Sequence, residues 1–271
     1  NLEQALRFYE RAADFGSAEA QYILGVKYDT GEGYRESSII AASLYQLAAQ
    51  QGFAQGQVAL ANKLYLGVGV PQNFIEAARY YRLAADQQNP EAQTNLAVMY
   101  INGQGLEKNI EEAIFLYLLA AEQGYPQAYM NLGWLYANGV GVEQDFTETI
   151  RYYRLGVEQN SAQAMVDLAI MYVSGQGVDQ DSNEAANLFR SAANLGFASA
   201  QSNLAVMYVN GSGVPEASLP TAYMWAWLAA EQGNEQAVVY VQALEQELSA
   251  NEIRDAKELA RTCVQNNFDN C

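Results

Sequence analysis

The paired glycines in the stretches NGQGLEKN and NGSGVPEA are the first feature of this sequence that could support chemistry. A G-x-G often opens a phosphate-binding loop, but such a loop follows a β-strand, contains a third glycine and precedes a helix within a βαβ unit. Here each G-x-G follows a segment with helical periodicity, lacks the third glycine and recurs six times along the chain. We therefore interpret these glycines as the turn between two helices, where they supply unusual backbone angles.

Other residue types narrow the chemistry further. The chain has no His, which excludes Ser-His-Asp triads, Cys-His pairs and His-ligated metals. The run VDQDSNEA offers Asp179, Asp181 and Asn183 in the spacing of a calcium loop. However, Glu184 and Arg190 occupy the positions where that loop needs Gly and Glu. We therefore expect no catalytic residue, no metal and no cofactor, and we interpret Asp181 as a helix cap.

The charge balance limits the partners. The net charge is −17 with a pI near 4.3, and no basic residue occurs between Arg190 and Arg254. A protein that neutralises phosphates needs clustered Lys and Arg, so nucleic acid and anionic membranes are disfavoured as partners. No apolar run approaches the ~20 residues of a membrane span. We expect a monomer without a transmembrane segment.

Both cysteines lie at the end of the chain, in TCVQNNFDNC. Cys263 and Cys271 could form a short disulfide that pins the C-terminus, which would imply an oxidising compartment. They could equally be two unrelated thiols. With this question open, a periplasmic or secreted location is slightly favoured over a cytoplasmic one.

A repeat of thirty-six residues organises the chain. The glycine that opens each G-x-G recurs at this interval, at Gly31, Gly67, Gly103, Gly139, Gly175 and Gly211. Aligned on these glycines, the repeats cover 17–52, 53–88, 89–124, 125–160, 161–196 and 197–233. A half repeat, 1–16, precedes them, and 234–271 is a C-terminal helical cap. We expect 1–271 to be one solenoid domain, and residue 1 to be a boundary or processing point.

Each repeat reads as helix, turn, helix. The first helix carries a small residue at its fourth position, Leu at the eighth and usually Tyr at the twelfth, so these side chains share one face. An Asn or Asp followed three residues later by Glu is typical of a capping box at the start of the second helix. This pattern occurs at Asn73, Asn109, Asp145 and Asp181, and again at Ser249. We interpret Trp225 and Trp227, in the last repeat, as structural.

These repeats resemble the Sel-1-like repeat family, which is related to the tetratricopeptide repeat. The matching patterns are A-x-x-x-L-G/A-x-x-Y-x-x-G-x-G-V and E-A-x-x-x-Y-x-x-A-A-x-x-G, and they cover essentially residues 1–248. The resemblance implies an all-α fold, a right-handed α-solenoid of antiparallel helix pairs, whose first helices line a concave surface. It also implies a scaffold or adaptor role, often in exported bacterial proteins. One cysteine-rich branch is linked to β-lactam binding or hydrolysis, but this chain lacks the paired cysteines and the S-x-x-K and K-T-G sequences.

By analogy with tetratricopeptide grooves, the concave surface comprises repeat positions three, six, seven, ten, thirteen and fourteen. Positions seven and fourteen place polar side chains along it, at Asn95, Asn102, Asn131, Asn138, Asp167, Asn203 and Asn210. Positions six and ten supply an apolar floor between them, with Val98, Met130, Trp134, Ile170 and Val206. A carboxamide can donate to and accept from a peptide backbone. Alternatively, the Asn residues cap or brace neighbouring helices, and Trp134 is a packing residue.

The leading hypothesis is a non-enzymatic scaffold that binds a protein or peptide segment in this groove. A carbohydrate-binding groove is the first alternative, because Trp and Asn also suit sugars. The second is a cell-envelope hydrolase. Without His it would need a carboxylate pair, such as Asp167 with a nearby Glu, and no spacing indicates one.

Overall fold

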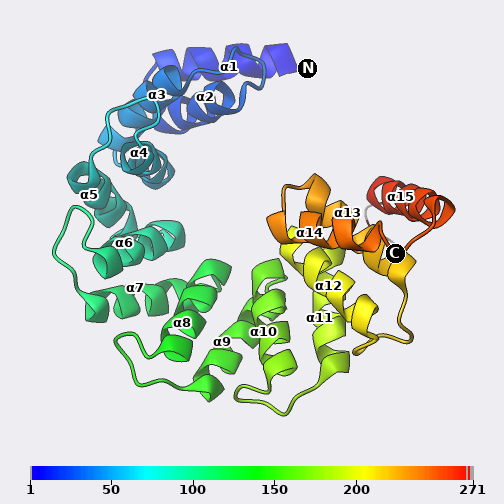
Figure 1. Ribbon diagram of the computed structural model, residues 1–271. Helices are drawn as coiled ribbons and strands as arrows, with labels where there is room; N and C mark the ends of the chain where they lie inside the picture. Colours follow the sequence, from blue (N-terminus) through cyan, green and yellow to red (C-terminus); the bar gives the residue numbers. More distant parts are fainter. Residues whose placement is uncertain (1, 267, 269–271) are drawn as a thin grey trace. The chain divides into compact units, whose positions relative to one another are not determined.

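The computed structural model describes residues 2–266 and 268, which contain fifteen α-helices and no β-strand. Consecutive helices pair antiparallel, and the pairs repeat about every 36 residues, which confirms the predicted all-α repeat fold (Figure 1). The chain divides into two compact units, Asn1–Ala128 and Tyr129–Cys271, here called unit 1 and unit 2.

Seven helices make up unit 1. They are α1 (Leu2–Asp14), α2 (Ala18–Thr30), α3 (Ser38–Gln50), α4 (Ala54–Leu66), α5 (Phe74–Ala85), α6 (Pro90–Asn102) and α7 (Ile110–Glu122). From α1 to α7 each helix packs against the next along the chain. The even-numbered helices are the first helices of the repeats, and Figure 1 shows α2, α4 and α6 on one side of this unit and α3, α5 and α7 on the other.

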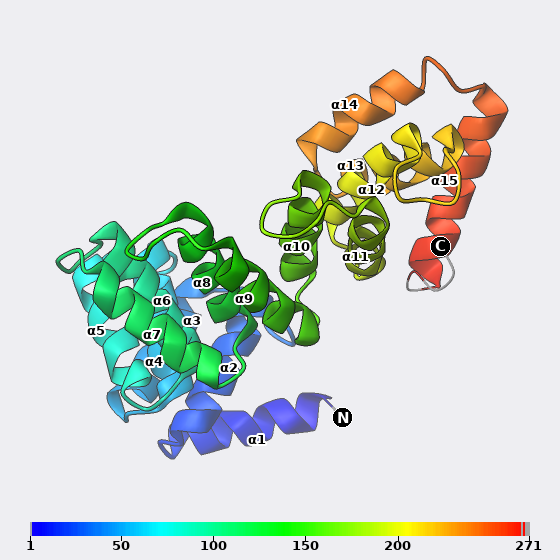
Figure 2. The ribbon, with the colours of Figure 1, turned by 90° about the horizontal axis from the view of Figure 1, so that it is seen from below.

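Among the described residues, unit 2 contains most of α8, whose first three residues belong to unit 1, and seven further helices. They are α8 (Pro126–Asn138), α9 (Phe146–Glu158), α10 (Ala162–Ser174), α11 (Ser182–Asn194), α12 (Ala198–Asn210), α13 (Leu219–Glu231), α14 (Glu235–Leu244) and α15 (Ala250–Gln265). From α9 to α14 each helix packs against the next, and the first helices α10 and α12 also touch directly. The last helix, α15, packs against α13, as Figure 2 shows from a second direction.

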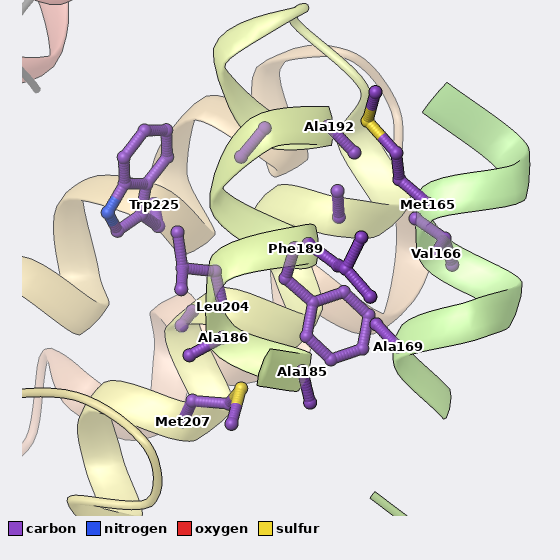
Figure 3. Close-up of a cluster of buried hydrophobic side chains, with 14 of the residues drawn as sticks. Met165, Val166, Ala169, Ala185, Ala186, Phe189, Ala192, Leu204, Met207 and Trp225 are labelled. Carbon is purple, nitrogen blue, oxygen red and sulfur yellow. The ribbon is translucent and has the colours of Figure 1, made fainter. Parts of the chain in front are cut away.

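The predicted core positions are buried in both units. The eighth position of every repeat is a Leu with at most 5% of its surface exposed, and the small residue at the fourth position is buried beside it. The second helices contribute a buried aromatic, such as Tyr45 or Phe189. Figure 3 shows Phe189 surrounded by side chains of α10, α11 and α12. Small residues at the crossings allow this close approach of neighbouring helices.

The structure confirms that the first glycine of each G-x-G ends a helix. Gly103 has φ of 66° and caps α6, and its N–H donates to the carbonyl of Met99. The second glycine of the G-x-G is needed for a different reason, the close approach of another helix. A Cβ on Gly105 would lie 2.3 Å from the carbonyl carbon of Phe74, the first residue of α5. The loop of one repeat therefore rests against the start of the previous repeat's second helix, and only glycine fits there.

The predicted caps form, but the full capping box is rarer than expected. The side chains of Asn73, Asn109, Asp145 and Asp181 each accept the backbone N–H of the Glu three residues later. The reciprocal bond from the N-cap N–H to the Glu carboxylate is seen at Ser249. In α5 the Glu76 carboxylate binds Arg79 instead, and in α9 Glu148 likewise binds Arg151. An Arg one turn further on thus competes for the carboxylate.

Buried glutamines connect successive repeats, a feature that the sequence analysis did not identify. Gln57 donates to the carbonyl of Ala49 at 3.4 Å and accepts a bond from Gln87 at 2.8 Å. Equivalent pairs form between Gln51 and Gln21, Gln123 and Gln93, and Gln232 and Gln201. In the remaining two repeats half-buried Tyr129 and buried Met165 occupy the equivalent position. The recurrence of Gln at the fifth repeat position was the signal available in the sequence.

The C-terminal part of unit 2 is held by aromatic packing. Trp225 is buried with 1% of its surface exposed, and Trp227 is half-buried with the Arg261 guanidinium 5.9 Å from its ring centroid. Both therefore pack in the structure, as predicted. Cys263 is buried in the same core. Cys271, with which Cys263 could form a disulfide, lies outside the described residues.

Candidate functional site

The predicted groove residues divide between the two units. We call the solvent side of α2, α4 and α6 the unit 1 face, and the solvent side of α8, α10, α12 and α14 the unit 2 face. Asn95, Val98 and Asn102 lie on the unit 1 face. The unit 2 face carries Met130, Asn131, Trp134, Asn138, Asp167, Ile170, Asn203, Val206 and Asn210.

Polar side chains on the unit 1 face bind one another. The hydroxyl of Tyr81 donates to Oδ1 of Asn62, and Nδ2 of Asn95 donates to the same oxygen at 3.4 Å. Nδ2 of Asn62 in turn donates to Glu91 at 3.3 Å. Burial, followed by the Glu91 charge, raises the pKa of Tyr81, so its hydroxyl stays protonated at neutral pH. Asn95 therefore braces adjacent first helices, as the alternative interpretation expects.

The rest of the unit 1 face is also internally satisfied. Exposed Asn102 donates to Gln104 at 3.4 Å, and Gln104 accepts the Tyr65 hydroxyl at 2.9 Å. An ion pair links Lys63 on α4 to Asp29 on α2. A shallow pocket of about 200 Å³ remains between α4 and α6, lined by Asn62, Tyr65, Leu66, Tyr81, Asn95 and Val98.

The unit 2 face is apolar and exposed at the corresponding positions. Trp134 is 51% exposed and Ile170 is 46% exposed, so neither is a core residue. Val173 and Val209 are also exposed, at 42% and 43%. They follow Ile170 and Val206 by three residues, a spacing that places each pair on one side of its helix. Their repeat position, the thirteenth, was predicted to belong to the groove, and the same spacing could have identified both residues.

One predicted groove residue lies in the core instead. Met130 is 6% exposed and packs within the buried cluster of unit 2, where its sulfur lies near Gly156. Its position in the repeat, the sixth, also holds buried Val58 and Val166. This position therefore points toward the second helices, and including it in the groove floor was wrong.

The amides of the unit 2 face bind mainly to their own helices. Nδ2 of Asn138 donates to the carbonyl of Trp134 at 2.8 Å, and Nδ2 of Asn203 donates to that of Ser199 at 2.9 Å. Asn131 is half-buried, and Asn210 is exposed. A carboxamide whose nitrogen is engaged keeps its oxygen as an acceptor. The unit 2 face can therefore accept hydrogen bonds from a ligand.

Asp167 is the charged side chain of α10, and it accepts a hydrogen bond from Nε2 of Gln163 at 2.9 Å. Burial raises the pKa of its carboxyl above the ordinary value of 3.8, and the Gln163 bond partly opposes this effect. Burial, with a smaller contribution from the Asp167 charge, raises the pKa of Tyr153 on α9 to about 12. Asp167 is thus half-buried, and its charge acts on Tyr153 of the neighbouring helix.

An apolar pocket of about 200 Å³ lies between α12 and α14, at the end of the unit 2 face. It is lined by Ala205, Val206, Val209, Tyr240, Ala243 and Leu244. Small and branched apolar side chains around such a pocket suit one apolar side chain of a ligand. α14 was expected only as part of the cap, so its contribution was not predicted.

The described residues contain no group of three or more His, Cys, Asp or Glu side chains arranged to hold a metal ion. Among the described helices, none combines the length and apolar character that crossing a membrane requires.

Comparison with known families identifies the repeat. Seven segments match the model of one family, described as Sel1 repeat: 1–17, 18–53, 54–89, 90–125, 126–161, 162–197 and 198–234. No curated protein sequence matches the chain.

Solved structures that are similar to this chain agree with the assignment to the Sel1 repeat. A Sel1 repeat protein from Oxalobacter formigenes is 30% identical with a TM-score of 0.74, over 84% of this chain and 93% of that one. The protective antigen c5321 of uropathogenic Escherichia coli, which has an SLR fold, is 25% identical with a TM-score of 0.55, over 97% of this chain and 65% of that one. An immunity protein, Pa5087 from Pseudomonas aeruginosa, is 18% identical with a TM-score of 0.53, over 84% of this chain and 81% of that one. At that identity the similarity is one of fold.

Proposed function

The chain belongs to the Sel1 repeat family, whose members are generally protein-interaction scaffolds, and from that premise we propose that it binds a segment of a partner protein on its unit 2 face. In this proposal the chain acts as a monomer and without catalysis. The fold of the family is generally a non-catalytic scaffold.

The exposed apolar residues of the unit 2 face are the observation that carries this proposal. Trp134, Ile170, Val173 and Val209 come from three different first helices, and all are at least 42% exposed. Grouped apolar side chains at a surface mark interaction sites more often than single ones do. Trp in particular is enriched among the residues that dominate binding energy.

The amides and the apolar pocket indicate which groups of a bound segment this surface can contact. The amide nitrogens of Asn138 and Asn203 bind the carbonyls of Trp134 and Ser199. Their carboxamide oxygens can accept backbone N–H groups of an extended segment. The pocket between α12 and α14 can take one apolar side chain of the same segment. The net charge of −17 disfavours a polyanionic partner.

The test uses peptides of defined sequence. Random peptides of about twelve residues are displayed, selected on the immobilised wild-type protein and synthesised, and their affinities are measured by titration. We expect Trp134→Ala and Ile170→Asn each to weaken binding by at least about tenfold, because each removes an exposed apolar contact. Circular dichroism and thermal unfolding should match the wild type, because both residues are half exposed.

Ile75→Asn is the matched control. Ile75 is 68% exposed on α5, a second helix of unit 1. Its substitution therefore replaces an exposed Ile side chain by an amide at a different surface. We expect it to bind like the wild type. The proposal would be contradicted if neither unit 2 substitution lowered the affinity of the selected peptides. It would also be contradicted if Ile75→Asn lowered that affinity equally. A glycan array that shows binding while no peptide is selected would favour the carbohydrate alternative.

A further inference from the structure

The carboxylate of Asp167 lies within the apolar unit 2 face. Ile170 follows it by three residues on α10, so the two side chains are neighbours on the helix surface. Val173, one turn further, is also exposed, and α10 packs directly on α12, which carries Val206 and Val209. An ionised group in such surroundings is costly unless a partner compensates it.

The fold does not require a charge at this position. In the other repeats the equivalent residue is neutral, namely Ile23, Ala59, Asn95, Asn131 and Asn203. All five lie on first helices of the same length and register. Because the same backbone accepts apolar and amide side chains here, packing alone does not explain Asp167.

The chain offers Asp167 no cation of its own on this face. The helices α8, α10, α12 and α14 contain neither Lys nor Arg. In the described part of the chain Asp167 accepts a hydrogen bond from Gln163 and interacts electrostatically with Tyr153. The Gln163 amide satisfies one carboxylate oxygen and leaves the charge uncompensated.

We infer that the partner segment presents a Lys or Arg side chain to Asp167, flanked by apolar residues that cover Ile170 and Val173. This inference rests on the proposed function and adds to it the chemistry of the partner. The acidic chain, with a net charge of −17, attracts a basic segment at long range. At the face itself, apolar contacts exclude water and strengthen the pairing of the two charges.

The apolar part of the segment has a defined place as well. The pocket lined by Val206, Val209 and Tyr240 lies at the far edge of α12, beyond α10. A segment that crosses the first helices can therefore place its basic side chain at α10 and an apolar side chain at the pocket. The partner is thus a mixed basic and apolar segment rather than a uniformly basic one.

Peptide selection on two versions of the whole chain tests this inference. Displayed peptides of about twelve residues are selected in parallel on the wild type and on Asp167→Asn, a residue that three other repeats carry at this position. Wild-type selection should enrich one Lys or Arg beside apolar residues, and Asp167→Asn selection should not. A synthetic peptide from the wild-type pool should bind Asp167→Asn at least about tenfold more weakly.

Asp179→Asn controls for the change in net charge, because Asp179 is exposed in the loop between α10 and α11. It should leave the affinity nearly unchanged at physiological salt. Selected peptides that depend on Ile170 but carry no basic residue, or bind Asp167→Asn as well as wild type, would overturn this inference and leave the proposed function intact. Failure to select any peptide that depends on Ile170 or Trp134 would remove the proposed function and the inference with it.

Discussion

The unit 1 face and the unit 2 face are built on the same helix pair, yet they differ in how their polar side chains are used. At the tenth repeat position of α4, unit 1 places Asn62, which binds Tyr81, Asn95 and Glu91, whereas Val26 and Val98 hold this position in α2 and α6. At the same position unit 2 places Ile170, which is 46% exposed. One face uses its polar groups to hold itself together, and the other leaves apolar surface available.

This difference shows how a repeat separates stability from recognition. The buried Leu and aromatic positions are occupied alike in both units, so either face can change without loss of the core. Where the face side chains bind each other, their substitution should affect folding. Where they are exposed and unpaired with neighbours, their substitution should affect binding.

The largest effect on stability is expected at Asn62. Asn62→Val removes the acceptor of the Tyr81 hydroxyl and leaves that buried donor unsatisfied, which should cost about 1–3 kcal/mol. The exchange in the opposite direction, Ile170→Asn on the unit 2 face, should change the free energy of unfolding by less than about 0.5 kcal/mol. Urea unfolding followed by circular dichroism measures both. Equal losses for the two variants would contradict the distinction between the faces.

A smaller loss is expected at the buried glutamines. Gln57→Met removes the bonds to Ala49 and Gln87 and should cost about 1 kcal/mol. The repeat that contains Met165 has Leu195 where Gln87 stands, so Gln57→Met combined with Gln87→Leu should be less destabilised than the single variant. A double variant at least as unstable as the sum of the two single ones would rule out this reading of the apolar pair.

A gain in stability is expected where a non-glycine residue adopts a left-handed conformation. Gln88 has φ of 62° at the position where other repeats have glycine, such as Gly52 and Gly124. Gln88→Gly should therefore stabilise unit 1 by about 0.5–1 kcal/mol. Asn160 has φ of 56° in unit 2, but Asn tolerates this region better, so Asn160→Gly should gain less. Thermal unfolding measures the gain in stability of each variant. A larger gain for Asn160→Gly than for Gln88→Gly would contradict the prediction.

The smallest expected effects depend on pH, and their signs differ between two carboxyls of unit 2. The pKa of Asp167 is raised by burial, so its contribution to stability is present below 3.8 and is lost as the pH rises through the folded-state pKa. The pKa of Glu252 is lowered by its bonds to Ser249, so its contribution is present above 4.5 and is lost as the pH falls. Asp167→Asn should therefore gain stability relative to wild type between acid and neutral pH, and Glu252→Gln should lose it. Unfolding midpoints of the two variants and the wild type are measured from pH 3 to pH 7. A change in midpoint of the same sign for both variants would contradict this account.

Periodicity was enough to predict much of the fold. Leu at every eighth position and glycine at an interval of 36 residues repeat locally, and local spacing fixes which side of a helix a residue occupies. The exposure of Trp134 and Ile170 agrees with the analogy to tetratricopeptide grooves, which left a packing role for Trp134 open. The burial of Met130 does not agree with it, because the sixth position lies at the border between the two sides and the packing of α9 decides which one it joins.

The sequence by itself determined the helix pairs, their caps, their turns and their core, because each depends on residues within one repeat or the next. The tertiary structure alone decided which polar residues satisfy one another. Asn62, Asn95 and Tyr81 come from three helices, and nothing in their local spacing shows that they share one oxygen atom. Hydrogen bonds and charges between helices depend on distances across the fold, whereas periodicity reports only the direction in which a side chain leaves its own helix.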